Sequence, residues 1–288
     1  MTQKTATAPP PTPLATAAHL VALDVDGTLA HSGRIPDVTV AAVRAALAAG
    51  HHLVIATGRS LVGVAPIIKR LGLRRGHVVC SNGAVTVRIS GRRLVIEDAV
   101  RFDAGPALRR AVDLIPEVLL ATEVLGKGYR VNDPFPGGLL NGRQRVVRRA
   151  RDLWAAPTGR ARDLWAAPTT RAVVHAPGVG RLARELRWFD VTVTLGSTTE
   201  PGDWLDLTAA GLSKASGLEA VRRRLRVAPE HTVAVGDGHN DLPMFEWAAR
   251  AVAMGNAPAA VQAAAGEVCG SVTEHGVVEV LRTMAGVR

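Results

Sequence analysis

The segment Leu23-Asp24-Val25-Asp26-Gly27-Thr28 constrains the fold of this chain more than any other. It follows an apolar run, residues 19–23, whose Val and Leu content and flanking Gly are typical of a buried strand. Carboxylates at the carboxyl end of a strand in an α/β sheet lie in the crevice where ligands bind. Gly27 allows a turn that points Asp24 and Asp26 in different directions. Asp-Gly is also a common turn dipeptide, so this segment alone does not decide between a site and a plain turn.

The same pattern of an apolar run followed by small or polar residues recurs along the chain. Three further runs of this kind are 52–56 before Thr57-Gly58-Arg59-Ser60, 77–80 before Ser81-Asn82-Gly83-Ala84, and 231–236 before Asp237-Gly238-His239-Asn240-Asp241. A hydroxyl beside Gly at a strand-to-helix turn suits phosphate binding, because the amides at a helix N-terminus favour anions. A simple N-cap is the alternative for Thr57 or Ser60.

Helical patterns alternate with these strands. We expect helices between Pro36 and Gly50, over residues 62–71, where Pro66 either kinks the helix or moves its start, and over 213–225 with Ser213 as its N-cap. Lys214 then lies in the first turn, where a cation opposes the helix dipole, a placement better suited to holding phosphate than to stabilising the helix. This alternation predicts an α/β fold with a parallel, doubly wound sheet.

The sequence changes character between residues 85 and 203. Runs 85–89 and 93–96 alternate around Ser90-Gly91-Arg92, which predicts a hairpin. A helical stretch and short apolar runs separated by Gly, Pro and Asp follow. We therefore expect an inserted α+β domain over 85–203, with the doubly wound core formed by 19–84 and 204–288.

Two low-information segments lie outside this scheme. Residues 1–18 are rich in Thr, Ala and Pro and lack the pattern of a signal peptide, so we expect a disordered leader. Residues 150–160 are repeated almost unchanged as 161–171. A tandem duplication in a surface segment explains the repeat most simply, and a lid or interface patch built from Trp154 and Trp165 is the alternative.

Composition excludes some functions. The net charge is +10, but the cations are mostly Arg spread along the chain, with one dense cluster at 143–151, and aromatic residues make up only 3%. Nucleic-acid binding is therefore an unlikely main role, and an Arg-rich surface that attracts phosphorylated substrates is favoured. No apolar run approaches the roughly 20 residues of a membrane-spanning helix. Cys80 and Cys269 alone make no disulfide framework, which favours a reducing, cytoplasmic setting.

Taken together and in this order, the strand-end groups resemble the four motifs of the haloacid-dehalogenase-like (HAD) superfamily. The corresponding residues are Asp24 with Asp26, then Thr57, then Lys214, then Asp237 with Asp241. The segments that resemble its Cof-type phosphatases are 56–59, 81–84, 236–241, 254–257 and 273–277. The resemblance covers about 19–84 and 204–285, and residues 85–203 correspond to the family's cap by position and size. It implies a Rossmann-like core with an inserted α+β cap domain.

The resemblance also implies a mechanism. Asp24 would attack phosphorus to form an aspartyl-phosphate, and Asp26 would act as general acid and base. Mg²⁺ would be held by the carboxylates of Asp24 and Asp237 and by the backbone carbonyl of Asp26. Asp241 would not bind the ion but would orient metal-bound water or Lys214. The expected phosphate-binding residues are Thr57, Gly58, Lys214 and Asn240, and possible substrate contacts are Arg59 and Asn82.

These residues predict a Mg²⁺-dependent phosphatase acting on small phosphorylated metabolites, with sugar phosphates first. Asp rather than Ser at position 26 favours phosphoryl transfer over dehalogenation. Two alternatives stay open: a phosphomutase of the same superfamily, and a non-catalytic protein that binds through its basic surface. The sequence predicts no membrane partner and does not define the oligomeric state.

Overall fold

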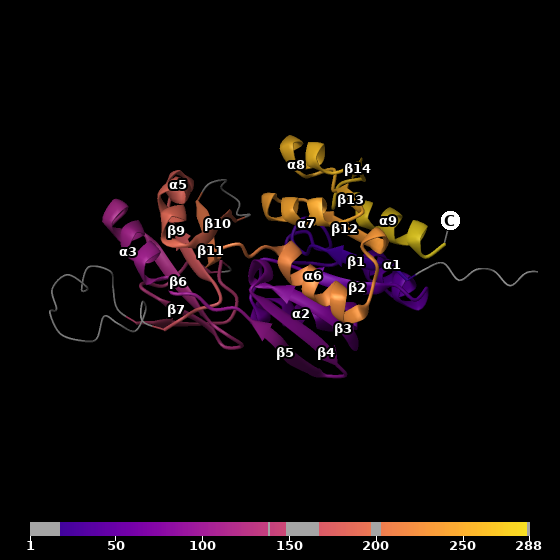
Figure 1. Cartoon of the computed structure of the whole chain (residues 1–288), viewed down its shortest axis with the longest axis horizontal. Helices are drawn as coiled ribbons and strands as arrows, with labels where there is room; N and C mark the ends of the chain where they lie inside the picture. Colours follow the sequence, from indigo (N-terminus) through magenta and orange to yellow (C-terminus); the bar gives the residue numbers. More distant parts are fainter. Residues whose placement is uncertain (1–17, 138, 148–166, 197–202, 287–288) are drawn as a thin grey trace, which may run out of the picture.

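The computed structural model describes residues 18–137, 139–147, 167–196 and 203–286. These residues form two sheets with their own helices, which Figure 1 shows as two lobes. The leader expected over 1–18 lies outside the described residues except at residue 18, and most of the tandem repeat, including Trp154 and Trp165, lies outside them too. No described helix has both the length and the apolar character needed to cross a membrane.

The first sheet carries the strand ends singled out above. Among the described residues it has eight strands in the order β14-β13-β12-β1-β2-β3-β4-β5. Their bounds are β1 Leu20–Leu23, β2 His52–Ala56, β3 Arg75–Cys80, β4 Val85–Ser90, β5 Arg93–Ala99, β12 Thr232–Gly236, β13 Arg250–Ala253 and β14 Glu267–Val268. The strands from β14 to β3 are parallel, and β4 and β5 continue the sheet antiparallel. The doubly wound α/β prediction is confirmed.

Helices cover both faces of this sheet. One face carries α1 Asp37–Ala48, α2 Leu61–Leu71 and α9 Gly276–Met284, and the other carries α6 Lys214–Leu225, α7 Leu242–Trp247 and α8 Ala259–Ala264. Strand β1 shows why the run is apolar throughout: Val21 and Leu23 pack toward the first set of helices, whereas Leu20 and Ala22 pack toward the second. Because side chains alternate along a strand, a sheet buried on both faces needs apolar residues at every position.

The second sheet is mostly antiparallel, with the order β10-β11-β9-β6-β7-β8. Its strands are β6 Leu119–Val124, β7 Gly128–Val131, β8 Arg143–Val146, β9 Ala172–His175, β10 Val191–Leu195 and β11 Trp204–Ala209, and only β7 and β8 pair in parallel. Helices α3 Gly105–Leu114 and α5 Ala183–Leu186 pack on one face through a separate apolar cluster. The other face lies toward the site described below.

Two segments belong to a different sheet from the one we expected. The hairpin β4–β5, assigned to the insertion, extends the first sheet, where Val85, Val87 and Ile89 join its apolar cluster. Strand β11, assigned to the core, pairs with β9 and β10 in the second sheet. Hairpin and strand patterns specify local structure, but the pairing partner depends on which sheet edge the chain reaches in three dimensions.

The loop after β3 packs closely against the start of α6. Ser213 caps α6, as expected, by accepting a hydrogen bond from the Ser216 backbone N–H. Gly83 has φ +102°, and a Cβ built there would lie 1.9 Å from the backbone oxygen of Ser213. Gly83 therefore allows the two backbones to approach, which fixes Ser213, and with it Lys214, against the end of β3.

We expect Gly83→Ala to lower stability markedly. A positive φ alone costs a non-glycine residue about 1–2 kcal/mol, and here the methyl group would also meet the Ser213 carbonyl. Gly91→Ala is the matched control, because Gly91 also has a positive φ, +62°, but nothing lies within 4 Å of its Cβ position. Urea unfolding of both variants checks this, and equal losses would show that the contact with Ser213 contributes nothing.

Candidate active site

The predicted residues converge at the carboxyl ends of the parallel strands. Asp24 follows β1, Thr57 follows β2 and Asp237 follows β12, while Lys214 is the first residue of α6. A cavity of about 680 Å³ opens there, and seven of the predicted residues line it: Asp24, Asp26, Thr57, Gly58, Arg59, Asp237 and Asn240. The remaining three, Lys214, Asp241 and Asn82, are buried. The first sheet therefore brings together chain segments more than 200 residues apart.

A fully buried lysine links two of the acidic residues. Lys214 Nζ lies 2.6 Å from Asp24 Oδ1 and 2.6 Å from Asp241 Oδ1, and the lysine side chain has no exposed surface. Burial alone lowers the pKa of Lys214, but the two carboxylates outweigh it and raise that pKa above its ordinary value. Lys214 is therefore a permanent cation at the base of the site.

Asp241 holds the loop after β12 as well as Lys214. Its second oxygen, Oδ2, accepts hydrogen bonds from the backbone N–H groups of Asp237 and Gly238 at 2.9 and 2.8 Å. Gly236 leaves room for this carboxylate, since a Cβ there would lie 2.5 Å from the Asp241 carboxyl carbon. Both oxygens of Asp241 are thus occupied by protein partners.

Asp237 is held at the cavity by a residue that sequence reasoning did not single out. Asn256 Nδ2 donates to Asp237 Oδ2 at 3.1 Å and to the Gly27 carbonyl at 3.0 Å. Its Oδ1 accepts from the Val272 N–H at 2.7 Å, so one amide joins three loops. The segment 254–257 was recognised as resembling Cof-type phosphatases, but the sequence reading gave Asn256 no role in the site.

Asp24 and Asp237 are the carboxylates available to a metal ion. One carboxylate oxygen from each of Asp24, Asp237 and Asp241 lies within 4.8 Å of the others, and of the three only Asp24 and Asp237 line the cavity. Within the described residues Asp24 Oδ2 makes no hydrogen bond. Burial, with the neighbouring carboxylates, raises the pKa of Asp24 well above its usual value and that of Asp237 to about 7. Such an excess of buried negative charge on hard oxygen ligands fits a divalent cation.

Asp26 lines the same cavity as Asp24 but pairs with Arg59 instead of Lys214. Gly27, directly after it, has φ +82°. Arg59 Nε donates to Asp26 Oδ2 at 2.7 Å and its second nitrogen donates to Oδ1 at 2.5 Å. The hydrogen bonds that Arg59 donates to Asp26 raise the pKa of Arg59 above its ordinary value. Arg59, expected to contact substrate, thus holds the predicted acid–base residue at the cavity wall.

Of the two N-cap candidates in this segment, the structure assigns the cap to Ser60. Ser60 caps α2, accepting from the Gly63 N–H at 3.3 Å. Helix α2 begins at Leu61 and continues through Pro66. Thr57 lines the cavity, where its hydroxyl accepts from the Arg59 N–H at 3.1 Å. Because Ser60 satisfies the helix end, Thr57 and Gly58 remain available to a ligand.

Asn82 bridges the two sheets instead of facing the open cavity. Its Oδ1 accepts from Asn240 Nδ2 at 3.1 Å, and its Nδ2 donates to Asp206 Oδ2 at 3.0 Å. Asn82 is 3% exposed and has φ +52°, a conformation that Asn tolerates better than most residues. The bridge connects the loop after β12 with strand β11.

The second sheet supplies a cavity wall that sequence reasoning missed. Asp206 Oδ1 accepts from Arg171 Nε at 2.8 Å and from Trp204 Nε1 at 2.9 Å, and Arg171 also donates to the Tyr129 hydroxyl at 3.1 Å. All four line the same cavity as Asp24. Asp206 had a weak signal, a carboxylate within an apolar strand; Arg171 had none, since it ends the tandem repeat.

A parallel α/β core with acidic strand ends around a cavity defines a class of enzymes in which carboxylates perform the chemistry. The chain belongs to the haloacid dehalogenase-like hydrolase family, whose model matches residues 21–107 and 188–281. The recognition made from the motifs is therefore confirmed, and so is the prediction of a phosphatase of that superfamily.

Known proteins that are similar to this chain over about nine-tenths of its length agree with this assignment. Phosphatase YwpJ of Bacillus subtilis is 27% identical, with 91% of this chain and 98% of that protein covered. Pyridoxal phosphate phosphatase YbhA of Escherichia coli is 29% identical, with 90% and 96% covered. The fold is similar to the solved structure of a HAD subclass IIB sugar phosphatase, with a TM-score of 0.71, 22% identity, and 92% and 98% of the two chains covered.

Replacing Lys214 should destabilise the protein strongly. Lys214→Met would leave Asp24 and Asp241 buried without a cation, and breaking a buried ion pair from one side costs about 3–5 kcal/mol. Lys69→Met, which removes an exposed lysine from α2, is expected to change the unfolding free energy by less than about 0.5 kcal/mol. Denaturant titration without metal checks both, and similar small effects would contradict the role assigned to Lys214.

The stability of the metal-free protein should fall as pH rises through the neutral range. Asp237 has a pKa of about 7 in the folded protein, raised from an ordinary 3.8. Between these values the folded state keeps a proton that the unfolded state has lost, so unfolding free energy decreases with rising pH. Asp237→Asn should flatten this dependence between pH 5 and 7 in the presence of EDTA. Parallel curves for the two proteins would show that Asp237 does not titrate in this range.

Proposed function

We propose that this enzyme hydrolyses small phosphate monoesters, with sugar phosphates as the foremost substrate class. The reaction would use Mg²⁺ and pass through an aspartyl-phosphate on Asp24. The observation that carries the proposal is the state of Asp24. One of its oxygens is fixed by Lys214 at 2.6 Å, whereas the other makes no hydrogen bond within the described residues, and the residue lines the cavity. A carboxylate anchored at one oxygen presents the other as a nucleophile.

The reaction would take place in two steps. In the first, Asp24 attacks phosphorus, the bond between phosphorus and the leaving oxygen breaks, and Asp26 gives that oxygen a proton. In the second, Asp26 takes a proton from a water molecule, which attacks the aspartyl-phosphate and releases inorganic phosphate. The ion pair with Arg59 keeps Asp26 at the wall of the cavity that Asp24 also lines. Because both oxygens of Asp26 accept from Arg59 in this pair, the pair would have to open for Asp26 to take up the proton that it gives in the first step.

Four residues would bind the phosphoryl group. An ammonium group has three hydrogens, and Lys214 uses two of them for Asp24 and Asp241, so one remains for a phosphoryl oxygen. The Thr57 hydroxyl, the backbone at Gly58 and the Asn240 amide line the same cavity. These donors would stabilise the charge that spreads over the phosphoryl oxygens during transfer.

The carboxylates of Asp24 and Asp237, with the backbone oxygen of Asp26, would hold Mg²⁺, and Asp241 would keep Lys214 and the loop of Asp237 in place. When bound, the ion would neutralise the charge between Asp24 and the incoming phosphate. Asn256 and Thr28 orient Asp237 through hydrogen bonds to its two oxygens.

The wall from the second sheet supports the substrate class. Arg171, Asp206, Tyr129 and Trp204 present hydrogen-bonding groups and an indole ring at the cavity, which suits a hydroxylated organic group. One relative named as a pyridoxal phosphate phosphatase, and a fold similar to that of a sugar phosphatase, support small phosphorylated metabolites as substrates.

We further propose that the second sheet is a cap that excludes water during the reaction. The cap proposed here differs from the insertion expected over 85–203. Strands β4 and β5 pair in the first sheet and are assigned to the core, and β11 pairs in the second sheet and is assigned to the cap. A cytoplasmic location is part of this proposal, and both cysteines are free, as a reducing compartment would have them.

Asp24→Asn should abolish phosphate release without unfolding the protein. The amide keeps the shape of the carboxylate but lacks the charge needed to attack phosphorus, so we expect a loss of about 10³-fold or more. Release from a panel of sugar phosphates and pyridoxal phosphate is measured with Mg²⁺ and with EDTA. Asp113→Asn, which removes a similar charge from the exposed face of α3, should keep full activity.

Three outcomes separate the alternatives. Metal-dependent release lost in Asp24→Asn supports the proposal. An isomerised sugar phosphate formed only with a bisphosphate primer, without free phosphate, would identify a phosphomutase. Release that persists in Asp24→Asn would exclude Asp24 as the nucleophile.

A further inference from the structure

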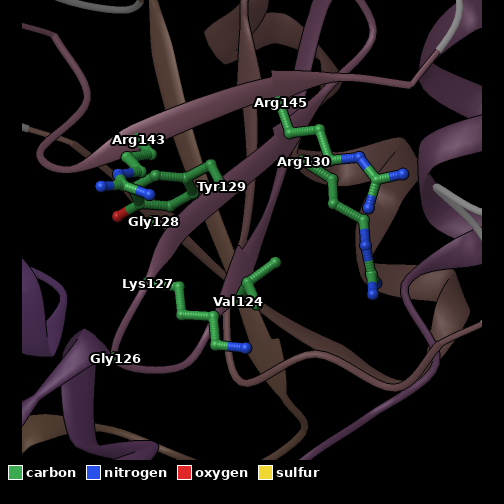
Figure 2. A pocket seen from close by; sticks show the side chains of 8 residues that line it. All are labelled: Val124, Gly126, Lys127, Gly128, Tyr129, Arg130, Arg143 and Arg145. Carbon is green, nitrogen blue, oxygen red and sulfur yellow. The ribbon is translucent and has the colours of Figure 1, made fainter.

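A second cavity contains four cations and no acidic residue. It measures about 610 Å³ and is lined by Val124, Gly126, Lys127, Gly128, Tyr129, Arg130, Arg143 and Arg145 (Figure 2). Lys127, Arg143 and Arg145 are exposed and Arg130 is half-buried. We call this surface, defined by these eight residues, the basic hollow.

The basic hollow lies on the other face of the second sheet from the catalytic cavity. Side chains alternate along a strand, so Gly128 and Arg130 point away from Tyr129, whose hydroxyl binds Arg171. The cluster beneath α3 and α5 draws on β6, β9, β10 and β11, and contains no residue of β7 or β8 in the described part of the chain. Among the described residues, nothing in that apolar cluster comes from these two strands, and cations stand on this face of β7 and β8.

The four cations of the basic hollow have no acidic residue among them. Some surface arginines elsewhere pair with carboxylates, as in Arg88–Glu97, Arg110–Glu185 and Arg250–Glu267, whereas others in the described residues, such as Arg92 and Arg93, form no ion pair. Within the same described ranges, none of Lys127, Arg130, Arg143 and Arg145 forms an ion pair. An ordinary solvated surface would mix the two charges, and this one does not.

The strand register places like charges directly opposite each other. Strands β7 and β8 pair in parallel with Arg130 beside Arg145 and Gly128 beside Arg143, and Figure 2 shows Arg130 and Arg145 side by side. Like charges at opposed positions destabilise a sheet. Gly128 brings the strands close here, because a Cβ at that position would lie 2.2 Å from the Arg143 backbone oxygen. An anion bound between the two guanidinium groups would attract both and compensate their mutual repulsion.

We propose that the basic hollow binds a compact polyanion with three or more negative charges, of the polyphosphate type. Its size falls within the range of small-ligand sites, about 300–1,000 Å³. Guanidinium groups bind phosphate oxygens in a bidentate manner. A single-stranded nucleic acid needs exposed rings for base stacking, whereas the one ring here, that of Tyr129, is 2% exposed. The side chains of the basic hollow therefore favour a compact polyanion over a single-stranded nucleic acid.

Calorimetric titration of sodium tripolyphosphate into the Asp24→Asn protein without Mg²⁺ tests the proposal. The substitution prevents turnover under the mechanism above, and binding is measured directly, so the result does not depend on that mechanism. We expect saturable binding of tripolyphosphate, about tenfold or more tighter than the binding of inorganic phosphate. Inorganic phosphate is the control for the contribution of a single phosphoryl group. The affinity for tripolyphosphate should fall with added salt.

Two double variants in this background locate the site. Arg130→Gln/Arg145→Gln should weaken tripolyphosphate binding by about tenfold or more. Arg92→Gln/Arg93→Gln removes the same charge from the exposed hairpin of the first sheet and should weaken it by less than about twofold. Equal losses would show general charge attraction and overturn the proposal, as would no loss in either.

A short single-stranded RNA serves as the competing probe. RNA binding that is lost in Arg130→Gln/Arg145→Gln, with no tripolyphosphate binding to the parent protein, would make the hollow a nucleic-acid site and the proposal wrong. Circular dichroism melts confirm that each variant is folded. If the double variant does not fold, Lys127→Gln, in the turn before β7, replaces it with an expected loss of about threefold or more, and an unchanged affinity overturns the proposal.

Discussion

The buried ion pairs of Lys214 with Asp24 and Asp241 are the interaction on which the site depends. A lysine with no exposed surface is stable only if its charge is compensated, and here two carboxylates from different strand ends do so. The same contacts place the nucleophile candidate, fix the loop that carries Asp237, and anchor the start of α6. Under the proposed mechanism, the fold holds this cation where a phosphoryl group would require positive charge. Stability and the proposed chemistry would therefore rest on the same three side chains.

A second polar connection joins the two sheets. It runs from Asn240 through Asn82 to Asp206 and on to Arg171, with each link at hydrogen-bond distance. Because these groups are buried or nearly so, each must keep its partner, and a shift of the second sheet would break the link between Asn82 and Asp206. The wall that would read the substrate is thus tied to the loop after β12, which also carries Asp237 and Asp241.

The sequence predicted the core better than the insertion for a physical reason. Strands β1, β2, β3 and β12 are buried on both faces, so each is a continuous apolar run that ends sharply, and the polar residues at those ends mark the site. The residues of the second sheet have no such signal. Arg171 precedes strand β9 instead of following a strand, and β4 and β11 have patterns that fit either sheet. Asn256 and Asp206 were visible as polar residues beside apolar runs, but their partners were not.

The sequence alone determined the doubly wound core, the superfamily, the N-cap at Ser213 and the set of acidic, hydroxyl and lysine residues at the strand ends. Each of these follows from local patterns, because burial and helix capping act over a few neighbouring residues. Only the tertiary structure decided that Arg59 pairs with Asp26, that Asn82 bridges the sheets, and that Arg171 and Asp206 line the same cavity as Asp24. The residues brought together in this way are 33 to more than 180 positions apart. How sheets and loops pack sets these neighbours, and no local pattern contains that information.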